Sequence, residues 1–159
     1  DPQCVQLPAC AQQPCAVTDP ELQITNANDS SNGAAIFWTG THYGLFWMNS
    51  TYRYGYARLD AAFTVVTQPT LVTGTSMAHR PFPAWTGTGY GIGWSDTRAG
   101  ALQFSNEVYF NRFNATTGVP MSGSDLGIST GPGMAFPSST GWNPVANEFG
   151  VSSRTKAPR

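Results

Sequence analysis

The chain has few charged residues and no long hydrophobic run. Of its 159 residues only 11% are charged, and the formal net charge at pH 7 is -1. Without a basic surplus the sequence has little with which to neutralise phosphate groups, so its composition argues against nucleic acid and against a polybasic membrane patch. The longest apolar run is the five residues from Ala34 to Trp38, whereas a membrane-spanning helix needs roughly 20. We therefore expect neither nucleic-acid partners nor a membrane span.

Cysteine and histidine are also scarce. The three cysteines, Cys4, Cys10 and Cys15, fall within the first fifteen residues, and the chain has two histidines. This spacing lacks the paired Cys-x-x-Cys clusters of zinc sites, so we interpret it as a local disulfide in an oxidising compartment, with the third cysteine free or joined to a partner chain. The histidines form no spacing motif, and we predict no catalytic residue, no metal site and no cofactor.

Aromatic, hydroxyl and amide side chains are abundant instead. Aromatic residues make up 13% of the chain, and much of the remainder is Thr, Ser, Asn, Gly and Gln. This balance is typical of extracellular all-β modules, so we expect a secreted or cell-surface protein. The chain opens on Asp1-Pro2-Gln3 without the basic and apolar segments of a signal peptide, so a secreted protein would be a processed form.

The sequence repeats itself. The motif Trp-Thr-Gly-Thr-x-Tyr-Gly-x-x-Trp at residues 38–47 recurs at residues 85–94, an offset of 47 (85 minus 38). Residues 56–60 correspond to 110–114 at an offset of 54, and a weaker third copy begins at Phe136-Pro137. A period near 50 made of short strands is typical of propeller blades.

Period-two alternation divides each full copy into four strands and predicts an all-β fold. The Cys-, Pro- and Gln-rich residues 1–20 are interpreted as an N-terminal extension, and residues 21–159 as the blades. Thr-Gly turns are expected at residues 39–42 and 86–89. The repeats lie approximately at residues 34–75, 81–130 and 135–159.

The strand count predicts an incomplete ring. One strand at residues 22–25, two sets of four, and two more ending near Ser152 give eleven strands, or about two and three-quarter blades. A propeller is expected to have at least four blades. We therefore expect another chain, or a cleaved segment of the same precursor, to supply the rest of this β-propeller.

In the second copy the Tyr-Gly-x-x-Trp strand at residues 90–94 is followed by Asp96 and Arg98, and then by a Tyr-Phe-x-Arg strand. This pattern resembles the blades of secreted bacterial β-propeller repeat proteins, over roughly residues 22–154. The first copy departs from it with Asn49 in place of Asp96, and the third copy lacks both tryptophans. The resemblance implies a propeller scaffold and no particular activity.

Few residues are candidates for ligand binding. Trp142 and Asn143 fall in an insertion of the third copy, which favours an irregular loop and a surface contact. Asp96 and Arg98 form a charged turn that could bind a cation or take part in acid–base chemistry; we favour a structural role in which the carboxylate accepts backbone N–H groups. The other tryptophans occupy blade positions and are expected in the core: Trp38, Trp47, Trp85 and Trp94.

Other repeated or modifiable positions have structural interpretations. Arg58 and Arg112 recur on the third strand and are expected to face inward, in an ion pair or aromatic stack rather than a substrate clamp. Asn28, Asn49 and Asn114 fit the N-glycosylation pattern. Three such patterns are only a mild excess over chance in a chain so rich in Asn, Ser and Thr.

The predicted function is a non-catalytic extracellular β-propeller module that binds a glycan or protein or serves in a surface structure, together with a complementary chain. One alternative is a fragment of a secreted hydrolase or lyase with a sialidase-like propeller, which would need clustered acids. The other is a subunit of a surface fibre or layer, favoured by low charge and open strand edges. The acids fall in different contexts with no repeated pair: Asp96, Glu107, Asp125 and Glu148.

Overall fold

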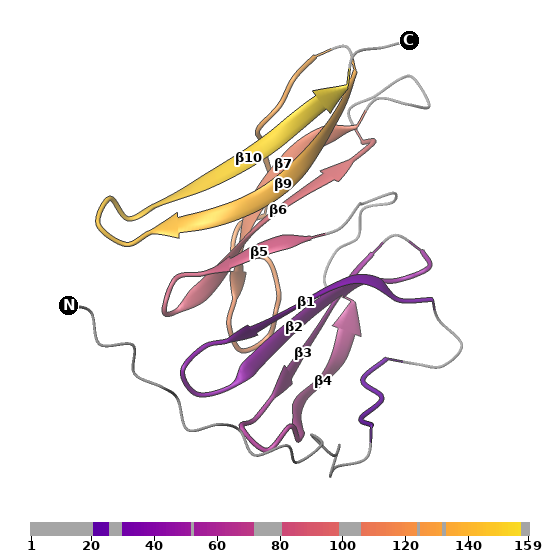
Figure 1. Ribbon diagram of the computed structural model, residues 1–159, viewed down its shortest axis with the longest axis vertical. Helices are drawn as coiled ribbons and strands as arrows, with labels where there is room; N and C mark the ends of the chain where they lie inside the picture. Colours follow the sequence, from indigo (N-terminus) through magenta and orange to yellow (C-terminus); the bar gives the residue numbers. More distant parts are fainter. Residues whose placement is uncertain are drawn as a thin grey trace, which may run out of the picture.

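The strands lie in three antiparallel sheets stacked one upon another (Figure 1). The computed structural model describes residues 21–25, 30–51, 53–71, 81–98, 106–123, 125–131 and 133–156. Within these ranges the chain forms ten strands and no helix, which confirms the predicted all-β class. Accordingly, the described residues contain no helix that is long and apolar enough to cross a membrane.

The first sheet is a four-stranded meander. Its strands are β1 (Asn32–Trp38), β2 (Tyr43–Met48), β3 (Tyr54–Leu59) and β4 (Val65–Leu71), which pair in the order β1-β2-β3-β4. The predicted turn between β1 and β2 is present: the backbone N–H of Thr39 donates to the carbonyl of His42 at 2.9 Å. Gly40 supplies the left-handed φ of 95° that this turn requires.

The second sheet repeats this arrangement. It consists of β5 (Phe82–Trp85), β6 (Gly89–Asp96), β7 (Glu107–Asn114) and β8 (Leu126–Gly127), in the order β5-β6-β7-β8. The turn between β5 and β6 again carries a left-handed glycine, Gly87, with φ 98°. The two four-stranded sheets agree with the division of the sequence into two full repeats.

The third sheet has two strands among the described residues, β9 (Met134–Asn143) and β10 (Glu148–Lys156). The strand predicted at residues 22–25 is absent, because residues 21–25 are described and form no strand. The described part of the chain therefore has ten strands and not eleven, and its sheets do not close into a ring. The sequence pattern places the fourth strands around residues 70–73 and 126–129. The observed strands differ, because β4 is Val65–Leu71 and β8 is Leu126–Gly127.

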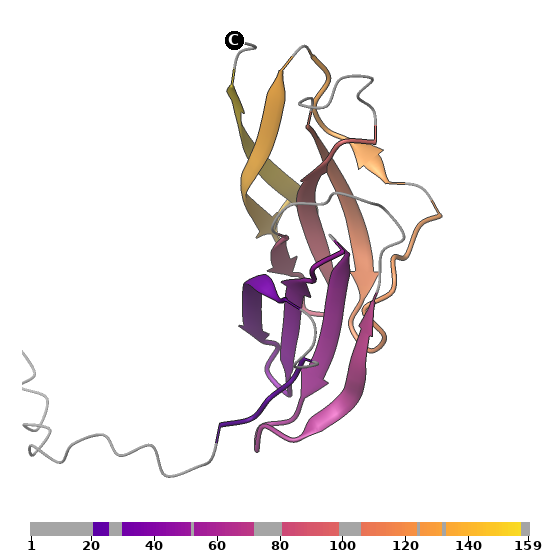
Figure 2. The same cartoon turned by 90° about the vertical axis from the view of Figure 1, so that its right-hand side faces the viewer.

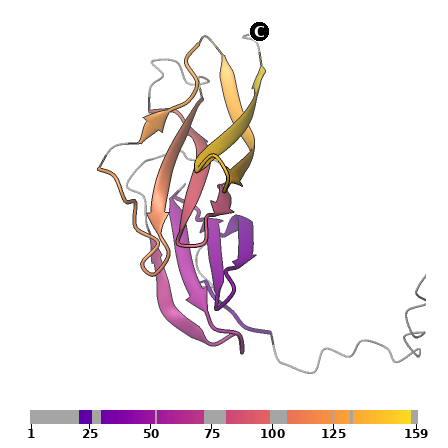
Figure 3. The same ribbon diagram turned by 90° about the vertical axis from the view of Figure 1, so that its left-hand side faces the viewer.

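The main core lies between the first two sheets. Side views place β4 and β8 on one side of the molecule and β9 and β10 on the other (Figures 2 and 3). The third sheet packs on the second, where the backbone N–H of Gly93 donates to Thr140 Oγ1 at 3.2 Å. Aromatic rings dominate the buried cluster between the first and second sheets: Phe46, Met48, Tyr54, Tyr56, Tyr90, Ile92, Trp94 and Phe113.

The four repeated tryptophans differ in burial. Trp47 and Trp94 are buried as expected, and Trp85 is half-buried against the core. Trp38 is 47% exposed, so its predicted place in the core is wrong. The physical reason is that the equivalent Trp85 packs against the preceding sheet, whereas no described sheet precedes the first one.

Candidate binding groove

An aromatic pair occurs at the same place in each sheet. The last aromatic residue of the first strand lies directly opposite an aromatic residue of the second strand in three cases: Trp38 and Tyr43, Trp85 and Tyr90, Trp142 and Phe149. Their ring centroids are 4.8, 4.8 and 4.7 Å apart, with interplanar angles of 50°, 51° and 50°. The aromatic pair is therefore a feature that all three copies of the repeat share.

This arrangement corrects the prediction for Trp142. The residue lies in β9 and not on an irregular loop, and it is the counterpart of Trp85. The equivalence was hidden in the sequence because the hairpin after Trp142 is longer: Phe149 follows it by seven positions (149 minus 142), whereas Tyr90 follows Trp85 by five (90 minus 85). The third copy has thus kept one of the two tryptophans.

Each aromatic pair that faces a preceding sheet packs over a glycine of that sheet. A Cβ at Gly44 in β2 would stand 2.0 Å from Oη of Tyr90, and a Cβ at Gly91 in β6 would stand 2.2 Å from Cε1 of Phe149. At such distances a side chain would fit only if the ring shifted. The two interfaces between sheets are therefore built by the same contact.

A groove of about 400 Å³ lies between the second sheet and β10. Two of its apolar residues are strongly exposed, Leu126 at 60% and Ile128 at 41%. Arg112 was expected to face inward but is exposed at this groove, whereas its counterpart Arg58 is half-buried. The groove is lined by Phe110, Arg112, Leu126, Ile128, Trp142, Asn147, Glu148, Phe149 and Val151.

One wall of the groove is a strand with an unpaired edge. Among the described residues β10 pairs with β9 alone, whereas the equivalent strands β2 and β6 are paired on both sides. An unpaired edge presents backbone N–H and C=O groups in a row that can pair with another strand. The groove therefore combines apolar side chains with backbone hydrogen-bonding groups.

The predicted charged turn is an ion pair between a buried carboxylate and a partly exposed guanidinium. Asp96 has an exposure of 0%, and its Oδ1 accepts the backbone N–H of Arg98 at 3.0 Å and Nε of the same residue at 2.9 Å. Its Oδ2 accepts Nε1 of Trp94 at 3.1 Å and also pairs with the Arg98 guanidinium. The favoured structural role of this carboxylate agrees with these contacts.

Arg98 joins this pair to a second carboxylate. Its Nη1 donates to Oδ2 of Asp125 at 2.5 Å, and Asp125 Oδ1 accepts Nδ2 of Asn111 at 2.8 Å. The guanidinium also lies over the ring of Tyr109, 4.2 Å from its centroid. Burial disfavours the charge of Arg98, but hydrogen bonds to the two aspartates outweigh it and raise the pKa.

The remaining acids are separate from this network. Glu107 accepts Oγ of Ser129 at 2.5 Å and the backbone N–H of Gly131 at 3.1 Å. Glu148 is exposed at the rim of the groove. No group of three or more His, Cys, Asp or Glu side chains in the described ranges is arranged to hold a metal ion.

The candidate ligand residues belong to two different places. The register of β6, β9 and β10 puts Asp96 at one end of the stacked sheets and Trp142 near the hairpin at the other. Asn143 is exposed, and its Oδ1 caps the hairpin by accepting the backbone N–H groups of Val145 at 3.1 Å and of Ala146 at 3.3 Å. The structure therefore brings Asp96 to Arg98 but does not bring either to Trp142.

The sequons differ in accessibility. Asn49 is 3% exposed, and its Oδ1 accepts the backbone N–H groups of Thr51 at 3.1 Å and Arg53 at 2.9 Å. Asn114 is exposed. Asn28 and the disulfide candidates Cys4, Cys10 and Cys15 lie outside the described residues.

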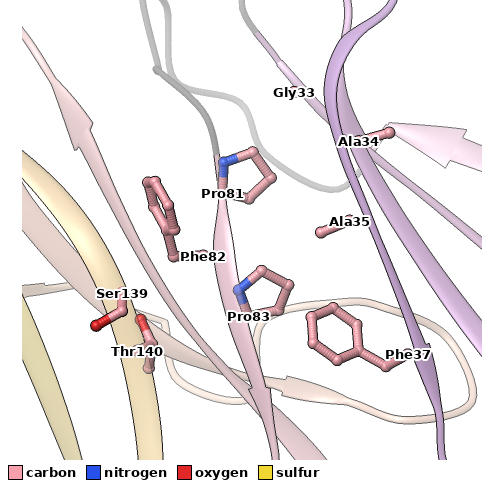
Figure 4. Close-up of a pocket in the computed structure, with 9 residues that line it drawn as sticks. All are labelled: Gly33, Ala34, Ala35, Phe37, Pro81, Phe82, Pro83, Ser139 and Thr140. Atoms are coloured by element: carbon pink, nitrogen blue, oxygen red, sulfur yellow. The ribbon is translucent and has the colours of Figure 1, made fainter.

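A second cavity of about 300 Å³ opens where β1, β5 and β9 converge. Figure 4 shows Phe37 and Pro83 on one side of it, and the hydroxyls of Ser139 and Thr140 on the other. These three strands are the first of their sheets, and each lies at a sheet edge. The first strands of the three sheets therefore lie around one hollow.

Comparison of the chain with protein-family models, with curated proteins and with solved structures found no match.

Proposed function

We propose that this chain is a non-catalytic extracellular scaffold of the β-propeller type, which acts in binding or surface structure by associating with a complementary polypeptide. The observation that carries the proposal is the free edge of β10 beside an apolar groove. An extended segment that pairs with this edge would bury Leu126 and Ile128, which are otherwise exposed. A protein strand fits this combination of backbone and apolar surface better than a glycan does.

The second sheet indicates what such a segment would look like. There β7 pairs with β6 over eight residues, from Gly89 opposite Asn114 to Asp96 opposite Glu107. Tyr109 and Phe113 of β7 pack toward the preceding sheet and the core. A strand added to β10 would place residues of this kind over Phe110 and Leu126. The expected partner therefore carries alternating aromatic or aliphatic side chains.

The state of the carboxylates supports a non-catalytic role. A hydrolase of the glycosidase kind needs two carboxylates that face one substrate. The oxygens of Asp96, Glu107 and Asp125 instead accept hydrogen bonds from Arg98, Ser129 and Asn111, which lie in or next to the second sheet. These contacts are those of carboxylates that stabilise the scaffold itself, and no substrate is needed to explain them.

The test supplies the missing strand. A copy of residues 107–114 is appended after residue 159 through a flexible Gly/Ser linker, which raises its local concentration to the millimolar range, of order 1 mM. The extended protein is expected to melt at a higher temperature and to show slower amide hydrogen exchange in β10. Hydrogen exchange reports the edge itself, because paired amides are protected.

The matched control carries the same eight residues in an order that destroys the alternation. If neither extension protects β10, its edge does not accept a strand and the proposal fails. If the scrambled extension protects β10 as well as the ordered one does, the edge does not select an alternating segment, and the proposed complementary strand is likewise excluded. A Leu126→Asp variant of the extended protein is expected to lose most of the protection, since it places a charge in the apolar groove.

A further inference from the structure

The two interfaces between the three sheets are built by the same kind of contact. At each end of the stack, the surface that makes this contact has no described partner. In each interface an aromatic pair packs over a cross-strand pair that contains a glycine of the preceding sheet, which we call the receiving pair. The receiving pairs are Phe37 with Gly44 in the first sheet and Ala84 with Gly91 in the second. Tyr90 and Phe149 fill them.

The third sheet presents a receiving pair of its own. Gly150 is the counterpart of Gly91 (150 minus 91 equals 149 minus 90), and it lies directly opposite Gly141. Both glycines are exposed, and nothing lies within 4 Å of a Cβ at either one. Neither has a positive φ. A left-handed backbone therefore does not explain these glycines. At the equivalent Gly44 and Gly91, the absence of a side chain admits an aromatic ring of the next sheet.

The first sheet presents an aromatic pair with no described sheet to receive it. Trp38 is 47% exposed, and Tyr43 is half-buried with its ring stacked on Phe63 at 4.8 Å. Ile36 and Phe63 extend the same exposed apolar area, at 54% and 51% exposure. Apolar clusters of this kind mark interaction surfaces.

We propose that the aromatic pair of one copy, Trp38 and Tyr43, docks over the Gly141–Gly150 receiving pair of a second copy. The two surfaces are complementary by the same contact that joins the sheets within one chain. This inference rests on the proposed function and names its partner as a second copy of this chain. The contact lies on the face of β10, whereas the strand-addition test probes the edge of β10.

The docking is head-to-tail, because each copy contributes a different surface. Such a heterologous contact either closes into a ring or continues as a filament. A direct consequence is that blocking either surface on every copy prevents assembly. Two copies blocked at opposite surfaces can still form one contact with each other.

The experiment uses two variants of the whole chain, Trp38→Lys and Gly150→Val. Trp38→Lys places a charge on the exposed aromatic pair, and Gly150→Val fills the receiving pair at a position with open space in the monomer. Matched controls make the same changes elsewhere: Met121→Lys at an exposed apolar side chain, and Gly123→Val at a glycine that also has nothing within 4 Å. Circular dichroism and thermal melts check that every variant is folded.

Light scattering over a wide concentration range gives the weight-average mass. The wild type and both controls are expected to increase in mass with concentration, and each blocked variant alone is expected to stay at the monomer mass. An equimolar mixture of the two blocked variants is expected to reach twice the monomer mass and no more, because only one contact can form.

The inference is overturned if the wild type stays monomeric, if either blocked variant associates alone, or if the mixture stays monomeric. Association of both blocked variants would indicate nonspecific contacts between apolar surfaces. A failed mixture combined with protection of β10 by the appended strand would exclude a second copy as partner and leave the proposed function standing.

Discussion

Tyr90 occupies the space that a side chain at Gly44 would need. A Cβ at residue 44 would stand 2.0 Å from the phenolic oxygen, and Tyr90 itself is 1% exposed. The first two sheets can approach this closely because β2 has no side chain at that point. The glycine is thus required by the approach of a ring from the next sheet and not by backbone conformation.

Replacement of Gly44 by alanine is expected to lower the free energy of unfolding by about 1–3 kcal/mol, the range for an overpacked core. Urea denaturation would measure the loss. The control is Gly123→Ala, where nothing lies within 4 Å and a change within about 0.5 kcal/mol is expected. Equal stability of the two variants would contradict the close packing of Tyr90 against β2.

Tyr56→Phe removes one hydrogen bond between the first sheet and the turn that follows β7. Oη of Tyr56 donates to the carbonyl of Ala115 at 2.6 Å, and the Tyr56 side chain is fully buried. The expected loss is about 0.5–1.5 kcal/mol by chemical denaturation. Tyr56→Ala also removes the ring and should cost roughly 3–5 kcal/mol. A Tyr56→Phe protein as stable as the wild type would show that this bond contributes nothing.

Arg98→Met is expected to leave the buried carboxylate of Asp96 without its countercharge. Removing one partner of a buried ion pair typically costs about 3–5 kcal/mol, and because Arg98 is partly exposed we expect the lower end of that range. Asp96→Asn combined with Arg98→Met should recover part of the loss. Asn49 is the counterpart of Asp96 in the first sheet, and its Oδ1 stabilises the equivalent turn by accepting backbone N–H groups. An amide at this position is therefore compatible with the turn.

The comparison of single and double variants forms a double-mutant cycle. Strictly additive losses would mean that Asp96 and Arg98 are not coupled, contrary to the geometry. Thermal melts at low and high salt provide a second measurement, since a buried pair is screened less than an exposed one.

His42 is expected to make stability depend on pH. Burial, and secondarily the positive charge of Arg58, lower its pKa below the usual value of 6.5. The unfolded chain therefore binds a proton more readily than the folded chain, so the stabilising contribution is complete above about pH 6.5 and is lost as pH falls toward the lowered pKa. Denaturation midpoints should drop between about pH 7.5 and pH 5.5.

The matched variant for this measurement is His42→Asn, which cannot titrate in that window. The difference in unfolding free energy between wild type and variant should shrink as the pH falls. A difference that stays constant, or grows toward acid, would be incompatible with a lowered pKa at His42.

Local sequence signals predicted the two four-stranded sheets well. The Thr-Gly turns at residues 39–42 and 86–89 have the expected hydrogen bonds. The turn after Asn114 also closes on a glycine with a left-handed φ, Gly118. Turn chemistry and period-two alternation are properties of a few neighbouring residues. They can therefore be recognised from the sequence without any knowledge of the tertiary structure.

Properties that depend on distant segments were harder to predict. Trp38 and Trp85 occupy equivalent sequence positions, yet they differ in exposure because only Trp85 has a preceding sheet to pack on. The sequence predicts a loop at Trp142 because a longer hairpin hides its alignment with Trp85. The apolar residues at 22–25 suggested a strand, but a strand needs a partner as well as a suitable composition.

The candidate groove was not identified from the sequence. Its walls come from β7, β8, β9 and β10, from Ile128 just after β8 and from the hairpin residue Asn147. The exposure of Leu126 and Ile128 follows from the two-stranded third sheet. The available signal was the segment Phe149-Gly150-Val151, which matches Tyr90-Gly91-Ile92 and supplies two of the groove residues, Phe149 and Val151.

Every β-ladder in the described ranges joins two strands that are adjacent along the chain. During synthesis the first sheet therefore has all its strands once residue 71 has emerged, and no later segment is needed to pair them. Because each strand pairs only with its neighbours along the chain, a whole sheet can be duplicated or deleted without disturbing the pairing in another sheet. A lineage could insert four more strands between β8 and β9 without altering an existing ladder, provided that a ring meets a glycine at each new junction.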